Sequence, residues 1–115
     1  MNLAPPLALA LALGLVAGCT KSGTGNTCAS TGAIAIDARD DSTFSPASLQ
    51  ITPTQTVCWE NLGKLTHTIT SDIVADSIDI TLPPDFTVTK GFGGITDFNY
   101  HCRFHPGMIG VIHVR

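Results

Sequence analysis

The sequence is short and contains few basic and few aromatic residues. Its 115 residues allow one domain rather than two. Six Lys and Arg residues stand against nine Asp and Glu residues, which gives a net charge of −3. Because nucleic-acid-binding proteins usually carry a basic patch or stripe, this charge balance argues against that class.

The sequence also lacks the patterns of several enzyme classes. The segment Gly91-Phe92-Gly93-Gly94 is followed by neither a Lys nor a predicted helix, so it indicates a turn rather than a phosphate-binding loop. The aspartates are scattered through predicted loops and strand ends, and no pair of them indicates general acid–base chemistry. We therefore expect a protein that is not an enzyme.

The N-terminal segment predicts export. Residues 3–18 are apolar and uncharged, but the run is shorter than the ~20 residues of a membrane span. Its ending, Val16-Ala17-Gly18-Cys19, resembles a bacterial lipobox, although a basic n-region is missing. We predict a lipoprotein signal peptide at 1–18 and lipidation of Cys19, hence a periplasmic or outer-surface protein anchored to a membrane. The alternatives are an ordinary signal peptide with an incidental Cys, or a retained helix.

The remainder of the chain predicts an all-β domain. Residues 20–30 are small and polar, so 19–30 is expected to be a lipidated Cys and a flexible tether, and 31–115 the domain. After residue 30, short β-branched runs alternate with turn residues, and no helical periodicity is sustained. Seven to eight strands in so short a domain predict a Greek-key β-sandwich or barrel. The predicted strands cover residues 33–38, 48–52, 56–61, 66–71, 78–82, 86–90, 95–103 and 109–114.

Alternation in the segment 95–103 predicts which side chains face the core. Phe98, Tyr100 and Cys102 share one face of this strand, and His101 lies on the other. The apolar set should face inward, so Cys102 is expected at the inner end of a core strand. Trp59 is a further predicted core residue.

Three potential metal ligands follow this strand closely. Cys102, His105 and Met108 have C-x2-H-x2-M spacing, and Pro106-Gly107 between them is a turn signal that allows the three side chains to converge. His67 is the best candidate for a fourth ligand. Two imidazoles, a thiolate and a weak thioether are the ligand set of an electron-transfer copper site.

Two other interpretations of these residues are open. In the first, Cys102 is a small core residue, His105 a turn histidine and Met108 a core residue without a metal. In the second, the site binds zinc, but zinc prefers four strong N, S or carboxylate ligands and rarely uses Met.

The sequence resembles the cupredoxins, the small type 1 blue copper proteins of the plastocyanin and azurin superfamily. The likeness covers residues 33–115 and is carried by Phe44-Ser45-Pro46, Val57-Cys58-Trp59-Glu60-Asn61, His67-Thr68-Ile69 and the segment 100–114. The short C-x2-H-x2-M loop resembles that of amicyanins, whereas plastocyanins and azurins have longer loops.

The resemblance implies one copper ion, Cu(I)/Cu(II), bound by His67, Cys102, His105 and Met108. Thr68 stands where the family has an Asn, so we expect the hydrogen bond that ties the two ligand loops to be altered. The implied activity is single-electron transfer by a monomer between redox proteins such as a cytochrome or a copper or haem oxidoreductase. The residues expected to form the docking patch around His105 are Leu62, Leu65, Phe104, Pro106 and Ile109.

Two cysteines remain after Cys19 and Cys102 are assigned. In an oxidising compartment Cys28 and Cys58 favour a disulfide, the alternative being two buried free thiols.

Two further functions stay open. One is copper delivery or resistance with the same ligands. The other is a nitrite-reductase-like copper enzyme subunit, which needs a second copper through His101. Residue 72 is Asp where a partner His would fall, so we interpret His101 as a surface histidine.

Overall fold

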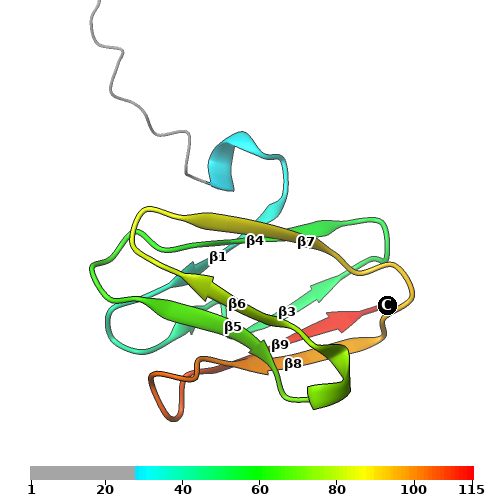
Figure 1. Cartoon of the computed structure of the whole chain (residues 1–115). Helices are drawn as coiled ribbons and strands as arrows, with labels where there is room; N and C mark the ends of the chain where they lie inside the picture. Colours follow the sequence, from blue (N-terminus) through cyan, green and yellow to red (C-terminus); the bar gives the residue numbers. More distant parts are fainter. Residues whose placement is uncertain (1–27) are drawn as a thin grey trace, which may run out of the picture.

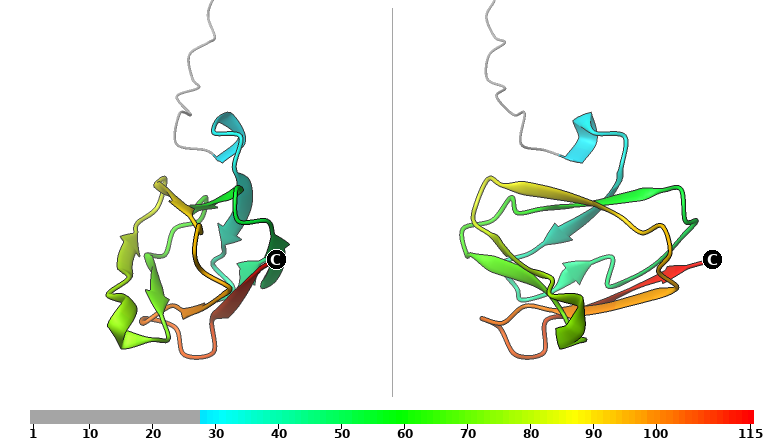
Figure 2. Two further views of the ribbon diagram at one scale, coloured as in Figure 1. Left: turned by 90° about the vertical axis from the view of Figure 1, so that its right-hand side faces the viewer. Right: turned by 45° about the vertical axis from the view of Figure 1, so that its right-hand side comes forward.

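The computed structural model describes residues 28–115, and there two β-sheets pack face to face (Figures 1 and 2). The four-stranded sheet has the order β2-β1-β4-β7, and the five-stranded sheet has the order β3-β9-β8-β5-β6. The strands are β1 (Ile34–Ala38), β2 (Phe44–Ser45), β3 (Ser48–Ile51), β4 (Thr56–Glu60), β5 (His67–Ser71), β6 (Asp79–Leu82), β7 (Thr87–Gly91), β8 (Asp97–His101) and β9 (Ile109–Val114). Two short 3-10 helices are η2 (Cys28–Ser30) and η3 (Val74–Asp76).

The strand pairing is mixed. β1 pairs with β4 and β3 with β9 in parallel, whereas the other neighbours are antiparallel. The prediction of an all-β sandwich is confirmed. Residues 28–115 form nine strands, one more than the upper end of the predicted seven to eight, because β2 is a two-residue pair with β1 and is too short to show a period-2 pattern.

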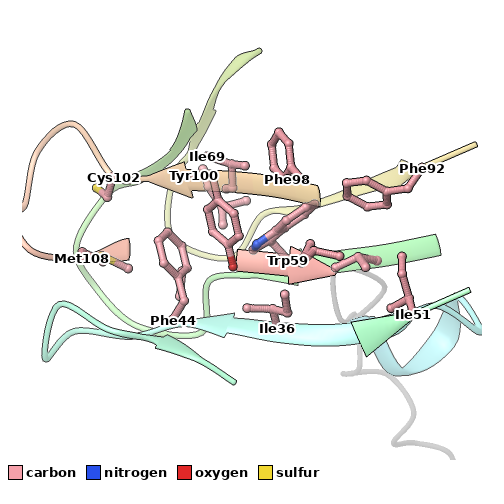
Figure 3. Close-up of a cluster of buried hydrophobic side chains, with 14 of the residues drawn as sticks. Ile36, Phe44, Ile51, Trp59, Ile69, Phe92, Phe98, Tyr100, Cys102 and Met108 are labelled. Carbon is pink, nitrogen blue, oxygen red and sulfur yellow. The ribbon is translucent and has the colours of Figure 1, made fainter. Parts of the chain in front are cut away.

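The core lies between the sheets and is centred on Trp59 of β4 (Figure 3). The Trp59 ring meets Tyr100 of β8 edge-on at 5.4 Å between centroids, and Phe98 at 6.4 Å. The side chains of Phe98, Tyr100 and Cys102 are all buried, which confirms the predicted inward face of this strand. Cys102 therefore sits at one end of the hydrophobic core.

A disulfide joins Cys28 of η2 to Cys58 of β4, so the first of the two sequence alternatives is confirmed. Both cysteines are buried, and the Cys28 amide also donates to Glu60 Oε2 at 2.9 Å. These contacts attach η2 to the four-stranded sheet (Figure 2).

The predictions for residues 1–27, including the signal peptide, the lipidated Cys19 and most of the tether, lie outside the described residues. Within 28–115, no helix has the length and apolar character needed to cross a membrane.

Candidate metal centre

The structure brings three of the predicted ligands together at one end of the sandwich. His67 is the first residue of β5, Cys102 follows β8, and His105 lies in the loop between β8 and β9. The two Nδ1 atoms of His67 and His105 are 3.2 Å apart. Cys102 Sγ lies 3.4 Å from His105 Nδ1 and 3.9 Å from His67 Nδ1. Within residues 28–115, this is the one cluster of three or more His, Cys, Asp or Glu side chains close enough to share a metal ion.

The loop that carries His105 and Met108 is closed by its own backbone. The Cys102 amide donates to the Met108 carbonyl and the Met108 amide to the His105 carbonyl, each at 3.0 Å. Gly107 has φ +90°, a conformation that favours glycine, in agreement with the predicted turn at Pro106-Gly107. Met108 is buried, and it lies with Cys102 at the same end of the core (Figure 3).

The environment of His67 keeps its imidazole neutral. Burial lowers the pKa of His67 below its ordinary value of 6.5, and the neighbouring His105 lowers it further, against an opposing effect of the Asp40 charge. Because a metal-ligating imidazole must be unprotonated, this lowered pKa favours ligation at neutral pH.

The three donor atoms have the spacing that one ion requires. Imidazole nitrogens and a thiolate sulfur bound at about 2.0–2.3 Å from a common ion lie roughly 3.3–3.8 Å from one another. The observed separations of 3.2, 3.4 and 3.9 Å bracket that range. The donor set therefore fits a transition-metal ion of the type that accepts nitrogen and sulfur ligands.

Thr68 ties the two ligand segments through its hydroxyl group. The Thr68 amide donates to Cys102 Sγ at 3.4 Å, and Thr68 Oγ1 accepts from the Arg103 amide at 2.9 Å. The residue after His67 is thus hydrogen-bonded to the residue after Cys102. The two segments are therefore connected although Asn is absent, and the hydroxyl group of Thr68 is the acceptor.

Sequence reasoning missed the residues that hold the loop before His67. The Asp40 carboxylate accepts hydrogen bonds from the amides of Lys64 and Leu65, and the Asn61 side-chain amide donates to the Leu65 carbonyl at 2.6 Å. Asn61 is one of the residues that carry the family resemblance, but nothing in the sequence marks Asp40, because its partners are 24 and 25 positions away.

The side chains predicted to form a docking patch are exposed. Leu62, Leu65, Phe104 and Ile109 are between 42% and 63% exposed, and Pro106 is also exposed. His105 is partly exposed, whereas His67 and Cys102 are buried.

Phe86 was not in the predicted patch and is 57% exposed. Its carbonyl accepts from the Asn61 amide, so it lies beside the residue that precedes Leu62.

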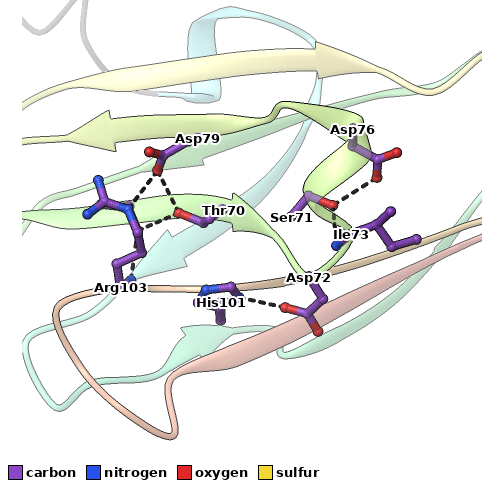
Figure 4. Close-up of polar contacts among 9 residues, drawn as sticks. Thr70, Ser71, Asp72, Ile73, Asp76, Asp79, His101 and Arg103 are labelled. Atoms are coloured by element: carbon purple, nitrogen blue, oxygen red, sulfur yellow. Dashed lines mark hydrogen bonds and ion pairs between the residues drawn. The ribbon is translucent and has the colours of Figure 1, made fainter.

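His101 lies on the outer face of β8, as predicted, and its Nδ1 is 2.6 Å from Asp72 Oδ1 (Figure 4). His113 of β9 also faces outward, with Nδ1 at 3.1 Å from Asp97 Oδ1.

The fold is that of the cupredoxins. The chain is similar to a reduced amicyanin variant with a TM-score of 0.65 and 24% identity, covering 74% of this chain and 84% of that one. It is also similar to the purple cupredoxin from Nitrosopumilus maritimus, with a TM-score of 0.60 and 24% identity over 71% of this chain and 99% of that one. A further match is the Cu(I) form of an amicyanin variant, with a TM-score of 0.63 and 24% identity, covering 73% and 83% of the two chains. No protein-family model and no curated protein sequence matches the chain.

Proposed function

We propose that this protein holds one copper ion with His67, Cys102, His105 and Met108 and carries single electrons between larger redox proteins. The observation that carries the proposal is the convergence of two imidazole nitrogens and one thiol sulfur on a common point at one end of the sandwich. Copper in such a site supplies a one-electron couple, since thiolate and thioether favour Cu(I) while imidazole also suits Cu(II).

The roles of the residues follow from where they lie. His67 and Cys102 are fixed by β5 and β8, so their donor atoms need little movement to bind. The Thr68 amide directs a hydrogen bond at the Cys102 sulfur and stabilises negative charge there. Met108 is the expected weak axial ligand, and its burial keeps solvent from that side. A site with rigid ligands and little solvent suits electron transfer.

The exposed apolar side chains around His105 are the proposed docking surface. His105 is the partly exposed member of the ligand set, and Phe104 and Pro106 flank it in sequence. A patch of this kind suits a transient encounter, whose interface is typically below about 1,200 Å². The partners we propose are a cytochrome or a copper or haem oxidoreductase, docking against a monomer of this protein.

We also propose that the protein is exported and anchored by a lipid on Cys19. The apolar segment before Cys19 supports this, and the Cys28–Cys58 disulfide suits an oxidising compartment. The test is the mass of the mature protein taken from membranes of the source cell, with Cys19→Ala as the control. A lipid-modified N-terminal Cys19 is expected. A mature chain that keeps residues 1–18, or that starts elsewhere, would exclude the anchor.

The central test is visible absorption and EPR of the purified protein after one equivalent of Cu(II), with metal quantified and Cys102→Ser measured alongside. We expect an intense thiolate-to-copper band at one copper per chain, and no such band in the variant. A colourless protein, or colour that survives the loss of Cys102, would contradict the proposal. Rapid transfer of the bound copper to an acceptor protein would favour copper delivery, and a second copper lost in His101→Ala would favour an enzyme.

A further inference from the structure

A closed ring of hydrogen bonds begins and ends at Arg103, the residue after Cys102. Figure 4 labels three of its members, Thr70, Asp79 and Arg103. The Arg103 amide donates to Thr68 Oγ1 at 2.9 Å, and Thr68 Oγ1 lies 2.9 Å from Thr70 Oγ1. Thr70 Oγ1 donates to Asp79 Oδ1 at 2.8 Å. The same Asp79 oxygen accepts from Arg103 Nε at 2.9 Å, which closes the ring.

The direction of every bond in the ring is determined by its chemistry. The Arg103 amide can only donate, so Thr68 Oγ1 accepts and has its one hydrogen left for Thr70. Thr70 in turn donates to Asp79, whose ionised carboxylate can only accept. The three bonds that run from the Arg103 amide through the threonines to Asp79 are aligned head to tail, so they polarise and strengthen one another, and Asp79 accepts from both ends of the ring. Loss of any member is therefore expected to weaken the bond to the Arg103 amide.

The ring stands where the strand pairing stops. β5 and β8 pair at Thr70 with His101 and at Ser71 with Tyr100. Nearer to the proposed ligands, β5 and β8 form no further backbone pair among the described residues. There the hydrogen bond from the Arg103 amide to the Thr68 hydroxyl group replaces the next backbone hydrogen bond between the strands. The Thr68 amide donates to Cys102 Sγ. Because Thr68 is a member of the ring, the ring also keeps this amide in position beside the sulfur.

We infer that Thr68, Thr70 and Asp79 are positioning residues for Cys102, and that the exposed Asp79 acts on the thiol through the two threonines. The effect on a copper site rests on the proposed function. A hydrogen bond to the sulfur favours the electron-rich, reduced state, so loosening the ring should lower the reduction potential.

The ring itself is tested in the metal-free protein by amide hydrogen exchange measured by NMR. Thr70→Val keeps the shape of Thr70 and removes the hydroxyl, whereas Thr70→Ser keeps the hydroxyl. Asp79→Ala removes the acceptor. We expect Thr70→Val and Asp79→Ala to speed exchange of the Arg103 amide by roughly fivefold, about the worth of one hydrogen bond. Thr70→Ser should leave the rate at the wild-type value.

The matched control is Asp76→Ala. Asp76 Oδ2 accepts from the hydroxyl of Ser71 at 2.8 Å, in the same strand as Thr70 but outside the ring (Figure 4). This variant should leave exchange of the Arg103 amide unchanged. An Arg103 amide that exchanges at the wild-type rate in both Thr70→Val and Asp79→Ala would overturn the ring, whether or not the protein binds copper.

The copper-loaded protein tests the link to the sulfur. Thr70→Val and Asp79→Ala should shift the reduction potential downward and move the thiolate-to-copper band, while Thr70→Ser and Asp76→Ala should match the wild type. An unmoved potential in a protein with a normal band would overturn the positioning role. If the wild type shows no such band, the proposed function fails, and the link of the ring to a copper potential fails with it. The exchange data then decide separately whether Thr70 and Asp79 strengthen the hydrogen bond between the Arg103 amide and Thr68.

Discussion

The Asp40 carboxylate caps the loop that leads into His67, because it accepts the Lys64 amide at 2.9 Å and the Leu65 amide at 3.2 Å. The fit is close enough that a Cβ on Gly63 would overlap the carboxylate. The loop between β4 and β5 is thus held by a residue from the segment after β1, and the position of the first histidine depends on it.

Removal of this cap should weaken metal binding. In Asp40→Ala the Lys64 and Leu65 amides lose their acceptor, so the loop before His67 becomes less ordered. We expect a several-fold lower copper affinity, in line with the worth of about one hydrogen bond. The measurement is competition with a coloured chelator. Asp41→Ala is the control, since Asp41 bonds only to Thr43 among the described residues. Equal copper affinities of Asp40→Ala and Asp41→Ala would contradict the role of Asp40 in holding the loop before His67.

Met108→Leu should raise the reduction potential and leave copper bound. Leucine has nearly the same volume but no sulfur, so the site loses a weak donor to Cu(II) and gains apolar character that favours Cu(I). Voltammetry of the two proteins measures the difference. An unchanged or lowered potential would count against an axial role for Met108.

Gly110→Ala should destabilise the fold by about 1–3 kcal/mol, because the added methyl would overpack the core. A Cβ at Gly110 would overlap the Tyr100 ring, with Cε1 only 2.7 Å away. Urea unfolding gives the free energy. Gly93→Ala is the control: nothing lies within 4 Å of a Cβ there, so its effect should stay within about 0.5 kcal/mol. Similar losses in the two variants would mean that the contact with Tyr100 is not the cause.

Loss of the Cys28–Cys58 disulfide should lower the free energy of unfolding by about 3–4 kcal/mol, the value that loop entropy gives for a closed loop of this length. The two cysteines are 30 positions apart. The comparison is urea unfolding of the double variant Cys28→Ala/Cys58→Ala against wild type, with thiol-reduced wild type as a second reference. Unfolding midpoints that agree across all three samples would show that the crosslink does not stabilise the domain.

The Asp97 carboxylate should stabilise the folded protein at neutral pH, and this stabilisation should be lost in acid. His113 and Arg115 lower the pKa of Asp97 below its ordinary value of 3.8, so the unfolded chain takes up the proton first as pH falls. The contribution is therefore complete above about pH 3.8 and lost as pH falls through the lowered pKa. Asp97→Asn should be less stable than wild type at pH 7, and the gap should close in acid. A gap that stays constant from neutral pH to pH 2 would contradict this.

Much of the fold and the donor cluster was predictable from the sequence. The alternation of Phe98, Tyr100 and Cys102 indicated the buried face of β8, and the turn at Pro106-Gly107 predicted that His105 approaches Cys102. Both patterns involve residues that are only two or three positions apart, so they can be recognised in the sequence without knowing how distant strands pair.

The supporting contacts were not predictable, because they depend on strand register. Thr70 and Asp79 meet because β5 pairs with β6, and Arg103 reaches Asp79 only because β8 lies on the other side of β5. No short-range pattern marks such partners. The identity of Thr68 is visible in the sequence, but whether its hydroxyl accepts from the Arg103 amide depends on how β5 lies beside the residues after β8.

The Cys28–Cys58 crosslink also determines how the domain would bear a mechanical load. A pull applied between the chain ahead of Cys28 and the C-terminus passes through the sulfur atoms directly into β4, which has neighbours on both sides in its sheet. Strands β1, β2 and β3 all lie between the two cysteines and are bypassed by the force. A domain tethered by its N-terminal side would therefore resist unzipping from β1, and tension would first reach the part of the chain that begins at β4.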